Sequence, residues 1–385
     1  MAEAVDLLAQ LVAIDSVNPD LVPGAAGEAA IGDFCAGWLQ ERGFEVHRLE
    51  ARPGRPSIVG IAQGAGGGRS LMFNGHYDTV GLTGYDGDPL NPVRRDGRLY
   101  GRGAFDMKSG VAAMMVAAAR AKEARLKGDV IVACVADEEH ASFGTEEVVA
   151  RFRADAAIVT EPSHLELTIA HKGFAWCEIV VSGRAAHGSR PDLGVDAIAK
   201  AGKFLTALEA WDRRLRAHPR HPRLGAGSVH ASLIEGGQEW SSYPAECRIK
   251  IERRTAPGET GASVAEEIRA ILAEIEAADP AFQAELIAGL DRPPFEIAEN
   301  EPIVTTLREA AATRLGQTPA WRGEPFWTDC AILAAAGIPC VMFGADGGGA
   351  HAAEEWAEER SVDALADILF ETAQDFCESA KSADA

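Results

Sequence analysis

The sequence is poor in cysteine, and its cysteines do not suggest a disulfide framework. The 385 residues include seven cysteines, an odd number, and none of them forms a Cys-x-x-Cys pair. Disulfide-stabilised secreted domains have dense and usually even sets of cysteines, whereas scattered ones are typical of reduced thiols. We therefore expect free thiols and a cytoplasmic protein.

Positive charge is also scarce. The chain has 37 Lys and Arg residues against 58 Asp and Glu residues, which gives a formal net charge of −21. Proteins that bind nucleic acids or anionic membranes concentrate positive charge to neutralise phosphate groups. We expect neither as a partner, and solubility is the simplest role of the acidic excess.

Long apolar runs are absent from the sequence. No stretch reaches the length of a membrane span, and the first residues, Met1 to Asp6, lack the basic start and apolar run of a signal peptide. We also find no internal repeat. The balance of 47% hydrophobic and 25% charged residues is ordinary for a globular protein. At this length, two domains are the default expectation.

What the chain does contain is a series of predicted strands that end in histidine or acidic residues. Three such junctions are Leu71–Phe73 with His76 and Asp78, Val130–Val135 with Glu138 and Glu139, and Ala156–Thr160 with Glu161. We take Asn74-Gly75 as the turn that ends the first strand. Ligand sites in open α/β sheets lie at the carboxyl ends of the strands. The run Asp137-Glu138-Glu139 fits either a solvated turn or a bound divalent cation.

Two further residues have an ordinary structural explanation when each is taken alone. Asp106 stands just before a predicted Ala- and Met-rich helix from Val111 to about Arg125, where Asp is a favoured N-cap. His351 follows the predicted strand Cys340–Phe343 through a glycine-rich loop. On these patterns alone, a helix cap and a solvated loop histidine are favoured.

The middle of the chain follows a different pattern. Between residues 172 and 296 the predicted order is β-α-β-β-α-β, the ferredoxin-like split arrangement. We predict an α/β protein whose catalytic domain, residues 1–171 and 297–385, has a mixed, mostly parallel sheet flanked by helices. Residues 172–296 would form an inserted α+β lid and dimerisation domain.

Five motifs together carry a resemblance to a known family. They are Gly75-His76-Tyr77-Asp78-Thr79-Val80, Gly101-Arg102-Gly103-Ala104-Phe105-Asp106-Met107-Lys108-Ser109-Gly110, Asp137-Glu138-Glu139, Glu161-Pro162 and Gly349-Ala350-His351. Their order resembles that of the zinc aminoacylase, acetylornithine deacetylase, succinyl-diaminopimelate desuccinylase and carboxypeptidase G family. The likeness runs from Ile14 to the C-terminal helix, nearly the whole chain.

This resemblance implies two divalent metal ions, with zinc expected and cobalt or manganese as alternatives. It gives His76 and Glu161 to one metal, His351 and Glu139 to the other, and Asp106 to both. Imidazole nitrogen and carboxylate oxygen suit zinc. Asp78 would fix the His76 ring, as metal-bound histidines usually require. Glu138 would be the general base that activates a water between the metals.

The resemblance also extends into the predicted inserted domain. Ser182-Gly183-Arg184-Ala185-Ala186-His187-Gly188-Ser189 resembles the family's lid motif, which implies that His187 contacts the oxyanion in the partner subunit of a homodimer. Glu252-Arg253-Arg254-Thr255-Ala256-Pro257-Gly258 resembles the family's motif whose arginine holds the substrate carboxylate, and the Pro-Gly spacing indicates Arg254 rather than Arg253 for that implied role. One departure is Ser242, where the family often has Asn before a proline.

The function expected from the resemblance is hydrolysis of the amide bond of an N-acyl amino acid, on the acetylornithine deacetylase pattern. A metal-dependent dipeptidase or carboxypeptidase is the alternative, because the same motifs serve both. A non-catalytic binding relative would lack a ligand or the base, and this chain has all of them. A metal-free structural protein is the remaining hypothesis.

Overall fold

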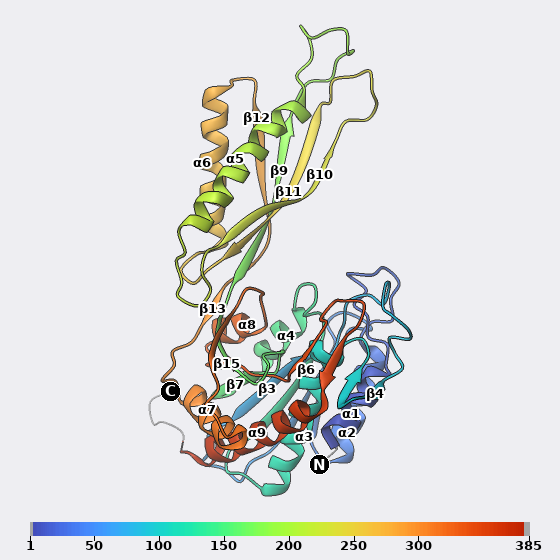
Figure 1. Ribbon diagram of the computed structural model, residues 1–385, viewed down its shortest axis with the longest axis vertical. Coiled ribbons are helices and arrows are strands. Elements are labelled where there is room, and N and C mark those ends of the chain that lie inside the picture. Colours follow the sequence, from blue (N-terminus) through green and yellow to red (C-terminus); the bar gives the residue numbers. More distant parts are fainter. Residues whose placement is uncertain (1–2, 381–385) are drawn as a thin grey trace. The chain divides into compact units, whose positions relative to one another are not determined.

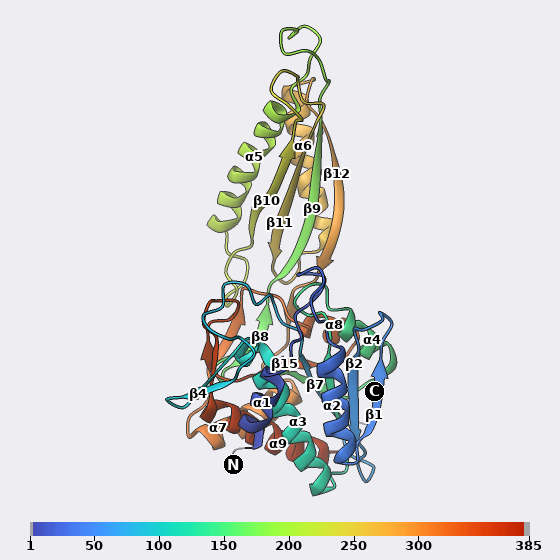
Figure 2. The same cartoon turned by 90° about the vertical axis from the view of Figure 1, so that its right-hand side faces the viewer.

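The computed structural model describes residues 3–380. The first two residues of the N-terminal segment discussed above, and the last five of the predicted catalytic domain, lie outside this range. The chain divides into two compact units. Figures 1 and 2 show the chain with colours that follow the residue number. Unit 1 comprises residues 1–169, 297–322 and 328–385, and unit 2 comprises residues 170–296 and 323–327.

Within residues 3–380, the largest sheet has nine strands. Eight follow the order β1-β2-β6-β3-β7-β15-β8-β13, and β14 pairs with β8. In chain order the strands are β1 (Glu45–Leu49), β2 (Ser57–Ala62), β3 (Leu71–His76), β6 (Val130–Val135), β7 (Ala156–Val159), β8 (Leu167–His171), β13 (Phe295–Glu296), β14 (Trp321–Glu324) and β15 (Cys340–Met342). The boundary between the units falls within β8 and β14.

Four neighbouring strands of this sheet run parallel. β3 pairs in parallel with β6 on one side and with β7 on the other, and β15 pairs in parallel with β7. β6, β3, β7 and β15 are buried throughout, as expected for strands covered on both faces. The expectation of a mixed sheet with parallel strands is confirmed, but in the eight-strand order parallel pairing is confined to these four strands, and the pairs outside them are antiparallel rather than mostly parallel. The carboxyl edge of the four parallel strands collects the chain segments that follow them.

The prediction that Asn74-Gly75 ends the first of these strands is wrong. Both residues lie inside β3, which continues to His76. A Cβ atom on Gly75 would stand 2.8 Å from Cε of Met107 and 2.9 Å from Oγ1 of Thr160. Glycine is needed here because two neighbouring segments approach the strand closely, not because the chain turns.

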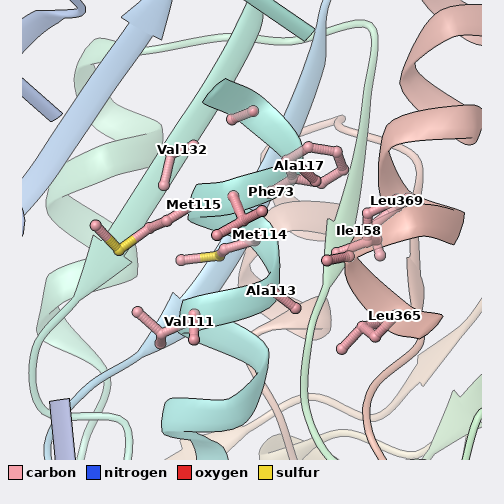
Figure 3. Packing of buried hydrophobic residues seen from close by; sticks show 14 of the residues in the cluster. Phe73, Val111, Ala113, Met114, Met115, Ala117, Val132, Ile158, Leu365 and Leu369 are labelled. Atoms are coloured by element: carbon pink, nitrogen blue, oxygen red, sulfur yellow. The ribbon is translucent and has the colours of Figure 1, made fainter. Parts of the chain in front are cut away.

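Helices cover the sheet of unit 1. They are α1 (Glu3–Val12), α2 (Ala29–Glu41), α3 (Ser109–Ala124), α4 (Phe143–Arg151), α7 (Pro302–Leu315), α8 (Cys330–Ala335) and α9 (Glu359–Glu378), with the short π-helical segment η1 (Ala104–Lys108) ahead of α3. Figure 3 shows residues of α3 packed between those of the strands and those of α9. Met114 and Met115 are fully buried there, and burial of such a side chain stabilises the fold by about 1.5–3 kcal/mol.

A small antiparallel sheet in unit 1 joins two loops that are far apart in sequence. Its order is β16-β17-β5-β4, from β4 (Val93–Arg95), β5 (Arg98–Tyr100), β16 (Gly347–Gly348) and β17 (Trp356–Glu358). Trp356 is paired with Tyr100. The loop between β16 and β17 is therefore held beside the segment that leads from β5 into η1.

Unit 2 contains a four-stranded antiparallel sheet of order β10-β11-β9-β12. Its elements are β9 (Gly173–Ser182), α5 (Ala197–Ala217), β10 (Ser228–Gly236), β11 (Glu246–Thr255), α6 (Gly261–Ala278) and β12 (Gln283–Arg292). Alternate residues of β9 and β11 share a core with α5 and α6, so both helices cover one face of the sheet (Figures 1 and 2). The element order is the β-α-β-β-α-β order of the ferredoxin-like arrangement.

All seven cysteines fall within residues 3–380, where each is a buried free thiol. In the same part of the chain, none of the helices combines the length and the apolar character that crossing a membrane requires.

Candidate metal centre

Histidine and carboxylate side chains gather at the carboxyl edge of the parallel strands. His76 is the last residue of β3, while Glu138 and Glu139 lie in the turn that follows β6. Glu161 comes two residues after β7, and His351 lies in the loop between β16 and β17. Because β6, β3 and β7 are adjacent and parallel, their ends deliver these residues to one place.

His76 is surrounded by three carboxylates. Its Nε2 atom lies 3.3 Å from Oε1 of Glu161, 3.4 Å from Oδ1 of Asp106 and 3.6 Å from Oε2 of Glu138. The imidazole is only 1% exposed. These atoms form the first group of candidate ligands.

A second group surrounds His351. Its Nε2 atom lies 3.0 Å from Oε2 of Glu139 and 3.3 Å from Oδ2 of Asp106. The two oxygens of Asp106 therefore face different histidines, Oδ1 toward His76 and Oδ2 toward His351. This is the arrangement that a carboxylate bridging two cations requires.

Asp106 does not cap a helix, so the explanation favoured by its local pattern is wrong. Helix α3 begins at Ser109, after Lys108 at the cap position. Asp106 itself lies in η1 with non-helical backbone angles of φ −112° and ψ 97°. The backbone turns its carboxylate toward the two histidines.

The spacing of the atoms around His76 fits a bound cation better than direct hydrogen bonds. Ligands held tetrahedrally at 2.0–2.1 Å from a zinc ion stand about 3.3 Å from one another. The distances from His76 to Glu161 and Asp106 match that spacing. Although Nε2 of His76 is buried, it has no aligned hydrogen-bond partner among residues 3–380.

Asp78 orients the His76 ring. Nδ1 of His76 lies 3.1 Å from the carbonyl oxygen of Asp78 and 3.5 Å from its Oδ1. A proton on Nδ1 would be donated to Asp78, which leaves the lone pair of Nε2 directed at the carboxylates. The side chain of Asp78 also accepts the backbone N–H groups of Glu138 and Glu139, at 3.1 and 3.2 Å. Asp78 thus holds the imidazole through its backbone carbonyl, with its carboxylate nearby, and holds the acidic turn through its carboxylate.

A buried polar network behind Asp78 was not identified from the sequence. Asn18 donates to Oδ2 of Asp78 at 2.8 Å and to Oδ1 of Asp137 at 3.1 Å. The Arg55 guanidinium donates to Asp137 at 2.9 Å and also contacts Glu28. Arg55 supplies positive charge to this network, but burial still raises the pKa of Glu28 to about 7 and raises the pKa of Asp137 above its usual value. The Ser-Val-Asn-Pro segment before Asp20 is the signal that could have led to Asn18.

The site carries more negative charge than its own side chains neutralise. Burial raises the pKa of Glu139 and of Glu161 to about 7, with the charge of Asp106 adding to the effect. Burial and the charge of Glu161 raise the pKa of Glu138 well above its usual value. Hydrogen bonds to Asp106 and Glu139 raise the pKa of His351 to about 10. Protons therefore occupy the metal-free site near neutral pH, where a divalent cation would displace them.

The metal-free protein should lose stability as the pH rises from about 5 to about 8. Glu139 and Glu161 titrate from 4.5 in the unfolded chain to about 7 in the folded one, so only the folded state holds their protons in that window. His351, raised from 6.5 to about 10, acts in the same direction. Each unit of pKa difference is worth about 1.4 kcal/mol.

Thermal melting in excess chelator at about pH 5 and about pH 8 measures this loss of stability. The Tm should fall toward the higher pH, whereas metal-saturated protein should not show the fall, because the cation replaces the protons. An unchanged or rising Tm in chelator would contradict the assigned electrostatics.

In unit 2, His187 is exposed on a loop that pairs with the segment around Ser242. The backbone N–H of Ser189 donates to Nδ1 of His187 at 3.2 Å. In this bond Nδ1 is the acceptor, so Nε2 is the nitrogen that can donate a hydrogen bond to a ligand. His187 forms a β-bridge with Ser242, and the N–H of Gly188 donates to the carbonyl of Ser241 at 2.6 Å. His187 and Ser242, which the sequence indicated for different reasons, therefore lie opposite each other on two paired segments.

Arg253 and Arg254 point to opposite faces of β11. Arg253 is fully buried on the face covered by α5 and α6, where it donates to Glu259 at 2.7 Å. Arg254 is on the other face, 30% exposed, and donates to Glu252 at 2.8 Å. Of the two arginines, only Arg254 has a guanidinium that a ligand can reach, the one that the Pro-Gly spacing had indicated.

Comparisons of the sequence with known proteins agree on one family. Residues 72–375 match the model of peptidase family M20/M25/M40. An acetylornithine deacetylase of Myxococcus xanthus is 32% identical over 353 residues, covering 88% of this chain and 87% of the relative. A deformylase of N-formyl-4-amino-5-aminomethyl-2-methylpyrimidine from Bacillus subtilis is 30% identical over 376 residues, covering 89% and 87%.

Solved structures share the fold. A tripeptidase from Staphylococcus aureus aligns with a TM-score of 0.81 at 22% identity, covering 98% of both chains. A dinuclear metal-binding peptidase of family M20 from Bacillus subtilis aligns with a TM-score of 0.74 at 18% identity, covering 97% of this chain and 98% of the other. The chain thus belongs to peptidase family M20/M25/M40 and is a hydrolase of amide bonds.

Proposed function

We propose that this protein removes the acyl group from an N-acyl amino acid, with two divalent metal ions, preferably zinc, as cofactors. The observation that carries the proposal is the position of Asp106, whose two oxygens face His76 and His351 at 3.4 and 3.3 Å. The relative at 32% identity, an acetylornithine deacetylase, supports this substrate class.

The residues present fit such a metal pair. His76 and Glu161 would hold one ion, His351 and Glu139 the other, and Asp106 both. When bound, the ions supply a Lewis acid for the scissile carbonyl and lower the pKa of water.

Glu138 is the proposed general base and acid. Its carboxylate, buried beside the ligands, would accept a proton from the attacking water and donate it to the nitrogen of the leaving amine. Burial and then the neighbouring charge of Glu161 raise the pKa of Glu138, which favours the protonated form needed for the second transfer. Asp78 positions His76 and takes no part in proton transfer.

Two residues of unit 2 complete the proposed mechanism. His187, with its proton on Nε2, would donate to the developing oxyanion. Arg254 would bind the carboxylate of the amino acid in a two-pronged ion pair. In this proposal the protein acts as a homodimer in which His187 serves the partner subunit's site.

A second candidate is release of a formyl group from an amine without a carboxylate. The relative at 30% identity, a deformylase of an aminomethylpyrimidine, favours it. In that case Arg254 would have no carboxylate to bind, which separates the two candidates.

The proposal is tested with metal-reconstituted protein and a panel of N-acetyl amino acids, N-formyl amines and dipeptides. Fastest hydrolysis of an N-acetyl amino acid is the expected result. Fast dipeptide cleavage without deacylation would replace the proposal with the peptidase alternative, and activity on formyl amines alone would favour the second candidate. Ultracentrifugation of the same samples tests the dimer.

Replacing Arg254 with Met should raise KM for carboxylate-bearing substrates by about 10- to 150-fold, since a hydrogen bond to a charged group contributes about 1.5–3 kcal/mol. The adjacent Arg253→Met variant is the matched comparison. It removes the 2.7 Å hydrogen bond from Arg253 to the buried Glu259, which keeps the Arg220 guanidinium at 3.4 Å and the N–H of Ala256 at 2.8 Å. It should therefore lower the free energy of unfolding by about 1–3 kcal/mol. Steady-state kinetics measure the effect of Arg254→Met on KM, and denaturant unfolding measures the effect of Arg253→Met on stability. Equal KM values for wild type and Arg254→Met would remove Arg254 from substrate binding.

A further inference from the structure

Glu355 is a buried carboxylate beside the candidate metal centre that none of the proposed catalytic steps uses. It is 1% exposed and lies four residues after His351, at the start of β17. A buried carboxylate is costly unless hydrogen bonds compensate it. Its partners therefore indicate what it does.

Among residues 3–380, the hydrogen bonds to this carboxylate all come from the segment that carries Asp106. Oε1 accepts the backbone N–H groups of Phe105 and Asp106, each at 3.0 Å. Oε2 accepts the N–H of Gly103 at 3.0 Å and the guanidinium of Arg102 at 2.7 Å. Four donors thus converge on one side chain.

The backbone around Glu355 reinforces the connection. The carbonyl of Glu355 accepts the N–H of Gly101 at 3.1 Å. The Arg102 guanidinium also donates to the carbonyl of Ala352 at 3.0 Å, next to His351. The loop with His351 and the loop with Asp106, about 250 residues apart in sequence, are therefore fastened to each other by one hydrogen-bond cluster.

We propose that Glu355 is a positioning residue of the metal centre: by binding the N–H groups of residues 103–106, it holds Asp106 in register with His351. The inference rests on the proposed function, because it needs the metal site to exist. Glu355 touches no ligand atom and acts through the backbone. Its effect should be larger at the His351 ion than at the His76 ion, because His76 and Glu161 are held on β3 and after β7.

The test compares Glu355→Gln with wild type. The amide keeps the size of the side chain, but its NH₂ group cannot accept two of the four donors. Titration with Co²⁺ or Zn²⁺ should show about 10- to 100-fold weaker binding of one ion, as expected for a residue that supports metal ligands. The other ion should bind with nearly unchanged affinity. Glu354→Gln, at an exposed neighbouring position, is the control and should match wild type.

A second readout separates positioning from general stability. Tm is measured for the metal-free and metal-saturated forms of each variant. A merely structural residue would lower both Tm values equally and leave the metal-induced rise unchanged, whereas a positioning residue reduces that rise. If Glu355→Gln does not fold, Glu355→Asp supplies the same comparison, since it keeps the charge and shortens the reach.

The outcomes distinguish the inference from the proposed function. Wild type that binds no metal would overturn the proposed function. The inference alone would be overturned by a different result. In that case wild type binds two ions, and Glu355→Gln or Glu355→Asp binds them with the same two affinities and shows the same metal-induced rise in Tm.

Discussion

Replacing Glu138 with Gln is expected to lower kcat on N-acyl amino acids by about 10²–10⁴-fold, the usual contribution of a general acid-base group. Gln has nearly the same shape but cannot accept a proton from water and pass it to the amine. In the structure, Oε2 of Glu138 lies 3.6 Å from Nε2 of His76, farther than the oxygens of Glu161 and Asp106. Loss of the Glu138 carboxylate should therefore leave metal binding intact.

The measurement pairs steady-state kinetics with metal content. Glu139→Gln is the informative contrast, because Glu139 lies 3.0 Å from His351 and its variant should lose affinity for the ion as well as activity. A Glu138→Gln protein that retains two ions and full kcat would remove Glu138 from the mechanism. One that loses an ion would make Glu138 a ligand instead.

Asp106→Asn should have the largest effect on metal content. Its carboxylate is the only group placed in both candidate ligand sets among the described residues. An amide offers one oxygen and one NH₂ group, so it cannot serve both ions. Binding of at least one ion should weaken by more than about 100-fold, the upper end for residues that only support ligands. Activity at limiting metal should fall with it.

Inductively coupled plasma mass spectrometry after dialysis measures the retained metal. His351→Ala is the matched variant, since it removes a ligand from the second group only and should keep the first ion. If Asp106→Asn retained two ions with wild-type affinity, Asp106 would not bridge them.

Much of the fold and the site could be anticipated because the relevant signals are local. Continuous apolar runs such as Val130–Val135 mark buried strands, and the polar residues that follow them fall at the sheet edge. His76 and Glu161 could be placed together on this argument alone. The resemblance added Asp106 and His351, whose local patterns favoured a helix cap and a solvated loop.

Other features had no local signal. The proposed role of Glu355 depends on its hydrogen bonds to backbone N–H groups about 250 residues earlier in the chain. The four strands of the small sheet are two or three residues long, too short for a periodic pattern to develop. Gly75 was taken as a turn residue because glycine serves both turns and close contacts, and its neighbours Met107 and Thr160, distant in sequence, decide between them.

The two ends of the metal centre differ in their access to water. The His76 side chain is 1% exposed and that of Glu161 6%, whereas the His351 side chain is 53% exposed. With two ions bound as proposed, we expect ordered exchange with the surroundings. The ion at His351 would meet incoming chelators first, and the ion at His76 would be released last. Partly loaded protein would then be a uniform one-ion species, and not a mixture of molecules that have each lost a different ion.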